Sequence, residues 1–182
     1  LTAIASFVPP GGRVADVGTD HGYIPLYLVK NGIVPSAIAM DVRSGPLSRA
    51  EEHVREQGLA DRIELRLSDG LDALRAGEAD TVVISGLGGP LMTEILTRGS
   101  RTAGAVKSFV LSPQSDIPGV RVFLRENGYR IAREALVRDE GKYYTVMLAE
   151  HGTDAPGRYI DDLYGRDLID RRDPVLIEYL RR

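Results

Sequence analysis

Acidic and glycine residues are interleaved in one short stretch near the amino terminus. Asp16 and Gly18 end an apolar run, and Asp20 and His21 precede Gly22. Glycines let the main chain approach a ligand closely, and a helix that begins after them directs free N–H groups at it. The stretch therefore predicts a site for a nucleotide-like cofactor, with Asp20 and His21 facing whatever reacts with that cofactor. The alternative is that the glycines only shape a tight turn.

Two further loops place an acid after a strand-like run. Asp41 ends the second such run, 23 residues after Gly18, where a carboxylate can accept from both ribose hydroxyls. Asp69 and Gly70 follow the third run, where an acid or a backbone group could bind the exocyclic amine of adenine. Three loops in succession, each with an acid at or near a glycine, favour a binding site over a set of turns.

Strand-like and helix-like patterns alternate through most of the chain, which is the signature of an α/β fold. Strands are predicted over 13–17, 36–41, 63–67, 81–85 and 108–111, and helices over 24–30, 44–57, 71–75, from about 90 and around 120–126. Two adjacent strands, 129–138 and 142–150, joined by a turn, then predict an antiparallel hairpin. We expect a seven-stranded, mostly parallel, doubly wound sheet that binds its ligand at the carboxyl ends of the strands.

Composition narrows the class of protein. The chain has no cysteine, so disulfides and thiolate metal sites are excluded. His21, His53 and His151 have no metal-ligand spacing, and His53 is expected at a helix surface. The net charge of −3 gives no bulk signal of nucleic-acid binding. The lack of cysteine suits a reducing cytoplasm and no apolar run is long enough to span a bilayer, so we expect a cytoplasmic protein that binds neither membrane nor metal.

The acid-and-glycine pattern of Asp16 and Gly18, Asp41, and Asp69 and Gly70 resembles the S-adenosylmethionine site of class I methyltransferases. Residues 15–25, 84–89, 110–114 and 140–144 resemble, more narrowly, the bacterial tRNA (adenine-22-N1)-methyltransferase family. The resemblance extends through Glu150 and implies a Rossmann-like class I methyltransferase fold, S-adenosyl-L-methionine as cofactor and tRNA as partner. It also implies methylation of N1 of adenine 22. The acid that follows the second strand is often Glu in the family, and Asp41 keeps its chemistry.

Transferred residue by residue, the resemblance implies that the cofactor is lined by the three loops and the one after the fourth strand. The predicted cofactor set is Asp16, Gly18, Thr19, His21, Gly22, Asp41, Val42, Asp69, Gly70, Ser85 and Gly86. The resemblance further implies that Asp20 is catalytic. N1 of adenine carries a lone pair and needs no deprotonation, so alignment should supply most of the catalysis. Asp20 could stabilise the developing positive charge, hold the N6 amine, accept a proton from it, or simply cap a helix.

Candidates for substrate contact come from loops and aromatic residues, because a target base turned out of folded RNA is commonly held by stacking. These candidates are Tyr23, Gly88, Pro113, Gln114 and Tyr143, with Tyr144 as a further aromatic. Arg43, Arg121, Arg125 and Arg138 could contact phosphates or could be solvated surface. The loop 85–89 lacks the Asn-Pro-Pro-Tyr type of sequence found in enzymes that methylate exocyclic amines.

The character of the chain changes after His151. We expect a catalytic domain over 1–151 and a linker with a short helical appendage over 152–182, in a monomeric protein. Family members usually carry a coiled-coil arm in the corresponding place. A small-molecule methyltransferase and a non-catalytic cofactor- or RNA-binding module are the alternative functions.

Overall fold

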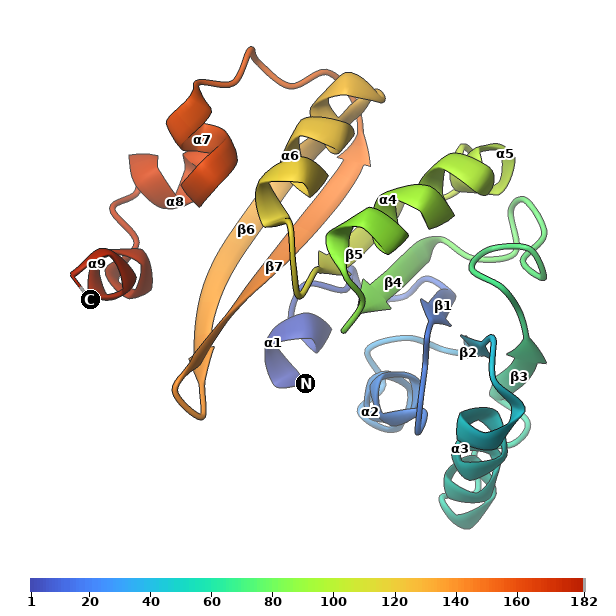
Figure 1. Cartoon of the computed structure of the whole chain (residues 1–182). Coiled ribbons are helices and arrows are strands. Elements are labelled where there is room, and N and C mark those ends of the chain that lie inside the picture. The colour runs from blue at the N-terminus through green and yellow to red at the C-terminus, as the bar shows by residue number, and fades with distance from the viewer. Residues whose placement is uncertain (182) are drawn as a thin grey trace.

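The computed structural model describes residues 1–181 and contains one seven-stranded sheet with helices on both faces (Figure 1). The strands run in the order β3-β2-β1-β4-β5-β7-β6. Their bounds are β1 (Val14–Val17), β2 (Ala37–Asp41), β3 (Ile63–Leu67), β4 (Thr81–Ser85), β5 (Ser108–Ser112), β6 (Tyr129–Asp139) and β7 (Lys142–His151). β1 to β5 pair in parallel, and β7 is antiparallel to both β5 and β6. This confirms the predicted fold class.

The core has two halves because side chains alternate across the sheet. Ala15 and Val17 of β1 pack on the side of α4 (Gly89–Arg98), α5 (Ser100–Ala103) and α6 (Ile117–Glu126). Val14 packs on the other side, under α1 (Thr2–Ala5), α2 (Tyr23–Lys30) and α3 (Ser44–Glu56). All four residues of β1 are buried, so the central strand is held from both faces.

One predicted helix is wrong. Residues 71–75 form turns, in which Asp72 N donates to Asp69 O and Leu74 N donates to Leu71 O. The backbone N of Arg75, which a helix would pair with Leu71 O, donates instead to the Glu78 carboxylate at 2.9 Å. The segment still buries Leu71 and Leu74, which explains its helix-like apolar spacing.

The C-terminal segment docks beside α6 and β6 (Figure 1). It comprises α7 (Tyr159–Tyr164), α8 (Arg166–Asp170) and α9 (Pro174–Leu180). α9 begins at Pro174, because the Asp173 side chain accepts from the N–H groups of Val175 and Leu176. Arg182, the last residue of the predicted appendage, lies outside the described residues.

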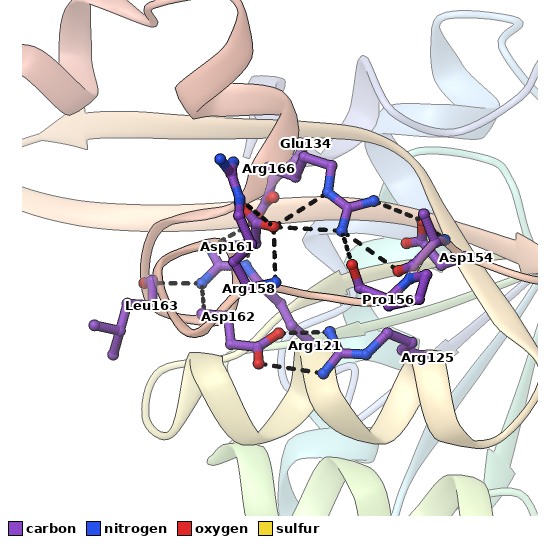
Figure 2. A network of polar contacts seen from close by, with 11 residues as sticks. Arg121, Arg125, Glu134, Asp154, Pro156, Arg158, Asp161, Asp162, Leu163 and Arg166 are labelled. Carbon is purple, nitrogen blue, oxygen red and sulfur yellow. Dashed lines mark hydrogen bonds and ion pairs between the residues drawn. The ribbon is translucent and has the colours of Figure 1, made fainter.

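Ion pairs and hydrogen bonds join this segment to the rest of the protein (Figure 2). Arg121 on α6 is buried, and its Nη2 lies 2.6 Å from Oε1 of the equally buried Glu134 on β6. Arg121 Nη1 also donates to the carbonyl oxygens of Asp162 and Leu163, and Arg125 pairs with the Asp162 carboxylate. We call this set, together with Asp161 and its partners Arg158 and Arg166, the C-terminal joint.

Candidate cofactor and substrate site

The corner between β1 and α2 is built by residues with left-handed backbone. Gly18 has φ 71° and Gly22 has φ 75°, values that L side chains adopt at a cost. A Cβ at Gly22 would also lie 3.1 Å from Ala50 Cβ, so the corner is pressed against α3. The turn is fixed by Thr19 N, which donates to Met40 O, and by Gly22 N, which donates to Thr19 O.

Asp16 carries the most perturbed carboxyl of this corner. Burial raises its pKa to about 7, the neighbouring Thr19 hydroxyl opposes that rise, and the charge of Asp41 adds to it. Asp16 Oδ2 and Thr19 Oγ1 are both buried, and although the two side chains lie close enough to affect one another, neither atom has a partner with hydrogen-bond geometry. Buried polar atoms normally have partners, so this pair fits a polar or cationic ligand group that completes the site.

Asp41 connects the corner to the end of β2. Its Oδ2 accepts from the backbone N of Asp20 at 3.2 Å, and its Oδ1 accepts from the backbone N of Arg43 at 2.9 Å. Each carboxylate oxygen retains a second lone pair, so both can also accept from ligand hydroxyls. The next residue, Val42, leaves an aliphatic side chain 61% exposed, which suits the flat face of a base.

The remaining predicted cofactor residues lie in the loops that follow β3 and β4. Asp69 is exposed and paired with Arg98 Nη2 at 3.1 Å, whereas Gly70 is buried against Ile95. Ser85 ends β4, and Gly86 N donates to Ser112 O. All eleven predicted cofactor residues therefore lie at or next to the carboxyl ends of four adjacent parallel strands.

Asp20 is exposed and does not cap α2. It has φ 51°, an uncommon conformation for a residue with a side chain. The N-cap of α2 is Gly22, and no side chain caps this helix. The helix-cap explanation of Asp20 therefore finds no support in the geometry.

A cluster of three rings lies beside Asp20. His21, Tyr23 and His53 stack pairwise with ring centroids 5.5 to 6.0 Å apart. His53 Nδ1 lies 3.0 Å from the His21 carbonyl oxygen, which can only accept, so Nδ1 donates. His53 lies on the surface of α3, as predicted, but it is partly buried because its ring packs in this cluster. Nothing in the sequence indicates that His53 belongs to this cluster, because only the fold brings α3 to the corner.

A cavity of about 460 Å³ opens next to the β4 loop. Ser85 and Gly86 line one side, Gln114 another, and Tyr144 the wall formed by the β6–β7 hairpin. Leu1 to Ile4 close the cavity from the amino-terminal end. Its size is that of a small-molecule site.

The structure brings only some of the substrate candidates to this cavity. Gln114 is exposed there, whereas Pro113 is buried behind it and Gly88 is the N-cap of α4. Tyr23 is exposed in the ring cluster. Tyr143 points away from the cavity, toward α9, and the neighbouring Tyr144 takes the lining position.

The four arginine candidates separate into two groups. Arg121 and Arg125 belong to the C-terminal joint, so the interpretation of them as phosphate ligands or solvated surface is wrong. Arg138 is paired with Glu178 and also lines the cavity, whereas Arg43 has a side chain 70% exposed at the rim of the corner. Among residues 1–181, no three acidic or histidine side chains group as metal ligands would, and no helix is long and apolar enough to cross a membrane.

Comparison with known proteins shows which class of protein has a corner of this kind. A sequence-family model described as "Methyltransferase domain" matches residues 1–147. The tRNA (adenine(22)-N(1))-methyltransferase of Bacillus subtilis (strain 168) is 35% identical over 152 residues, which are 84% of this chain. The chain spans 64% of the length of that relative.

Two solved structures share the fold over almost the whole chain. The crystal structure of the B. subtilis M1A22 tRNA methyltransferase TrmK superposes with a TM-score of 0.91 at 32% identity, covering 98% of this chain and 78% of that one. M. capricolum TrmK, solved with the cofactor product S-adenosyl-homocysteine, gives a TM-score of 0.88 at 25% identity, covering 99% and 80%. The chain thus belongs to the methyltransferase-domain family. Within that family, the chain belongs to the tRNA (adenine-22-N1)-methyltransferases.

Proposed function

We propose that this protein binds S-adenosyl-L-methionine at the β1 corner and methylates N1 of an adenine, position 22, in tRNA. The observation that carries the proposal is the buried, unpartnered pair of Asp16 Oδ2 and Thr19 Oγ1, near the charge of Asp41. A structural acid would be expected to have its own partner in the protein. An acid that awaits a cationic ligand would not.

The cofactor residues divide by chemistry. Asp16 and Thr19 suit the amino end of the methionine moiety, because an ionised carboxylate and a hydroxyl both accept from an ammonium group. Asp41 suits the two ribose hydroxyls, and Val42 and Asp69 suit the face and the exocyclic amine of the adenine. Gly18, Gly22, Gly70 and Gly86 keep the backbone close, while His21 and Ser85 border the same space. S-adenosylmethionine, when bound, supplies an electrophilic methyl group.

The protein's remaining task is to hold the target base. The cavity beside Gly86 offers polar groups from Ser85 and Gln114 and an aromatic ring from Tyr144, which suits an adenine turned out of the RNA. Asp20, at the corner and exposed, can stabilise the positive charge that the ring gains on methylation at N1. Tyr23 and Arg43 lie on the rim, where neighbouring nucleotides would pass.

The proposal also covers the arrangement of the chain. Residues 1–151 form the catalytic domain, and residues from 152 form a linker and helical appendage that docks on it. We place the protein in the cytoplasm, acting as a monomer on tRNA, without a metal and without a membrane partner.

Two measurements test the proposal in sequence. Titration calorimetry with S-adenosyl-L-methionine should give saturable binding, and an absence of binding would reject the cofactor assignment. Methyl transfer from radiolabelled cofactor to unmodified tRNA, followed by nucleoside mapping, should place the label on N1 of adenine 22. Label found only on small molecules would favour a small-molecule methyltransferase, and binding without transfer would favour a non-catalytic module.

The role of Asp20 has its own test. Asp20 donates its backbone N–H to Asp41, a bond that Ala keeps, and its carboxylate lies 3.7 Å from His21 Nε2. Asp20→Ala should therefore leave cofactor affinity nearly intact and lower methyl transfer on the order of 100-fold. Asp20→Asn is the matched control for backbone conformation, since Asn tolerates the same left-handed φ. If Asp20→Asn loses activity like Asp20→Ala, the carboxylate charge is needed. Unchanged turnover in both variants would reject a catalytic Asp20.

A further inference from the structure

The β6–β7 hairpin separates the substrate cavity from the C-terminal helices, and its two faces have different neighbours. Val137 pairs with Tyr144 across the two strands, and both line the cavity. One position along, Arg138 pairs with Tyr143, and the Arg138 side chain itself reaches the edge of the cavity. Successive side chains on a strand point to opposite faces. Tyr143, with Leu136 and Thr145, accordingly lines a separate hollow of about 340 Å³ under the C-terminal helices.

Glu178 on α9 holds the tip of this hairpin from behind. Its Oε1 accepts from Arg138 Nη1 at 2.7 Å and from Tyr143 Oη at 3.0 Å, so one carboxylate binds both strands. The Tyr179 ring packs edge-on against the Tyr143 ring, with centroids 5.1 Å apart. Hydrogen bonds to a charged acceptor are stronger than neutral ones. The tip is therefore tied to α9 at the level of Tyr144 in the cavity wall.

α9 is itself anchored, so it can act as a support. Asp173 caps its first turn and also accepts from Arg171 Nη2 at 2.8 Å. The same Arg171 nitrogen donates to the backbone oxygen of Glu134 at 3.0 Å, which ties the start of α9 to β6. Leu176 is buried in the middle of α9. The α9 region therefore contacts the hairpin at two places, at Glu134 through Arg171 and at the hairpin tip through Glu178.

We propose that Glu178 is a positioning residue for the RNA substrate: through Arg138 and Tyr143 it fixes the hairpin wall, and with it Tyr144, at the cavity that takes the target base. This inference rests on the proposed function. It assigns the C-terminal segment a part in substrate placement, although none of its residues lines the cavity. Arg138 and Glu178 are both more than two fifths exposed, so the pair adds little to global stability. A loss of activity on breaking it would consequently report on position.

The test compares the carboxylates of Glu178 and Glu150, each of which pairs with an arginine on β6. Glu178→Ala should lower kcat/KM for unmodified tRNA on the order of tenfold, because small misplacements of a bound reactant cost rate steeply. Its dissociation constant for S-adenosyl-L-methionine should stay within about twofold and its Tm within about 4 °C. Glu178→Gln, which keeps an acceptor oxygen of similar reach, should recover most of the activity.

Glu150→Ala is the matched control. Glu150 on β7 pairs with Arg130 on β6 at 2.6 Å, an ion pair of similar exposure at the opposite end of the hairpin. This variant should behave as the wild type. If Glu178→Ala and Glu150→Ala give equal kcat/KM, the inference is overturned.

A second readout works without any methyl transfer. Amide hydrogen exchange over 137–144 should be faster in Glu178→Ala than in wild type or Glu150→Ala, because local opening reports the loss of a local tie. Equal exchange in all three proteins would overturn the inference even if the wild type methylated nothing. Inactivity of the wild type together with faster exchange in Glu178→Ala would reject the proposed function and leave the tie between α9 and the hairpin standing.

Discussion

The β1 corner and the C-terminal joint both bury charged side chains, but only one of them satisfies those side chains internally. At the joint, Arg121 contacts Glu134 and two backbone carbonyls. At the corner, Asp16 Oδ2 has no partner. Buried groups that the protein satisfies by itself serve structure, whereas a buried group left unsatisfied indicates a ligand. The contrast distinguishes the binding site from an equally charged but structural region.

The pKa values follow the same division. Burial raises the pKa of both Asp16 and Glu134, but at Glu134 the Arg121 guanidinium opposes the effect of burial. Asp161, surrounded by Arg158 and Arg166, has its pKa lowered. At the corner the charge that acts on Asp16 is another acid, Asp41, and it raises the pKa of Asp16 further. A cationic ligand would reverse that balance.

The largest effect is expected at the joint. Glu134→Ala leaves the Arg121 guanidinium buried without its carboxylate, and the free energy of unfolding should fall by about 3–5 kcal/mol. Denaturant unfolding without cofactor measures this, with Glu150→Ala as an exposed-pair control that should cost less than about 1 kcal/mol. Cofactor affinity, measured below the unfolding transition, should be unchanged. A variant that lost affinity while keeping its stability would contradict the division between the two regions.

Asp16→Asn should have the opposite profile. The free energy of S-adenosyl-L-methionine binding should weaken by about 2–3 kcal/mol, because a charged acceptor for an ammonium group is lost. The folded-state pKa of Asp16 lies above its unfolded value, so the carboxyl contributes a destabilisation that grows as pH rises from about 4 to about 7. At pH 8 the Asn variant without cofactor should be as stable as the wild type or more stable. Calorimetry and thermal unfolding check the two parts, and a large loss of stability would mean that Asp16 is structural.

The smallest effect is a dependence of affinity on pH. If the ligand is cationic it binds the ionised form of Asp16, so affinity should rise as pH rises through about 7 and then level off. The gain between pH 6 and pH 8 should be on the order of tenfold. Titrations of wild type and Asp16→Asn across this range measure it, with the Asn variant expected to be flat over the same interval. A wild-type profile that is also flat would show that Asp16 does not change its charge on binding.

Much of the fold could be predicted from the residues that end the apolar runs of the sequence. Glycine and aspartate close the apolar runs that become β1 to β4, and the turn at 139–141 separates β6 from β7. The segment 71–75 could not be predicted, because the Glu78 carboxylate outside it takes the Arg75 N–H that a helix would use. The order in which β7 lies between β5 and β6 depends on contacts between distant parts of the chain.

The residues of the candidate site likewise include some that the sequence predicts and some that only the fold brings together. The acids and glycines could be found because each lies beside its own strand, whereas His53 reaches the corner only through the packing of α3. Of the two adjacent tyrosines, the sequence offers both Tyr143 and Tyr144, and the presence of α9 behind the hairpin decides which one faces the cavity. Arg121 and Arg125 resemble surface cations until residues 134 and 162 are placed beside them.

The position of β7 has a consequence for how the chain is synthesised. β5 pairs with β4 on one side and needs residues 142–151 on the other. Until that last strand has left the ribosome, the apolar strand Ser108–Ser112 is an open sheet edge, and open edges recruit other chains. A nascent or truncated chain that stops short of residue 142 should aggregate through β5, so the solubility of the protein depends on strand β7.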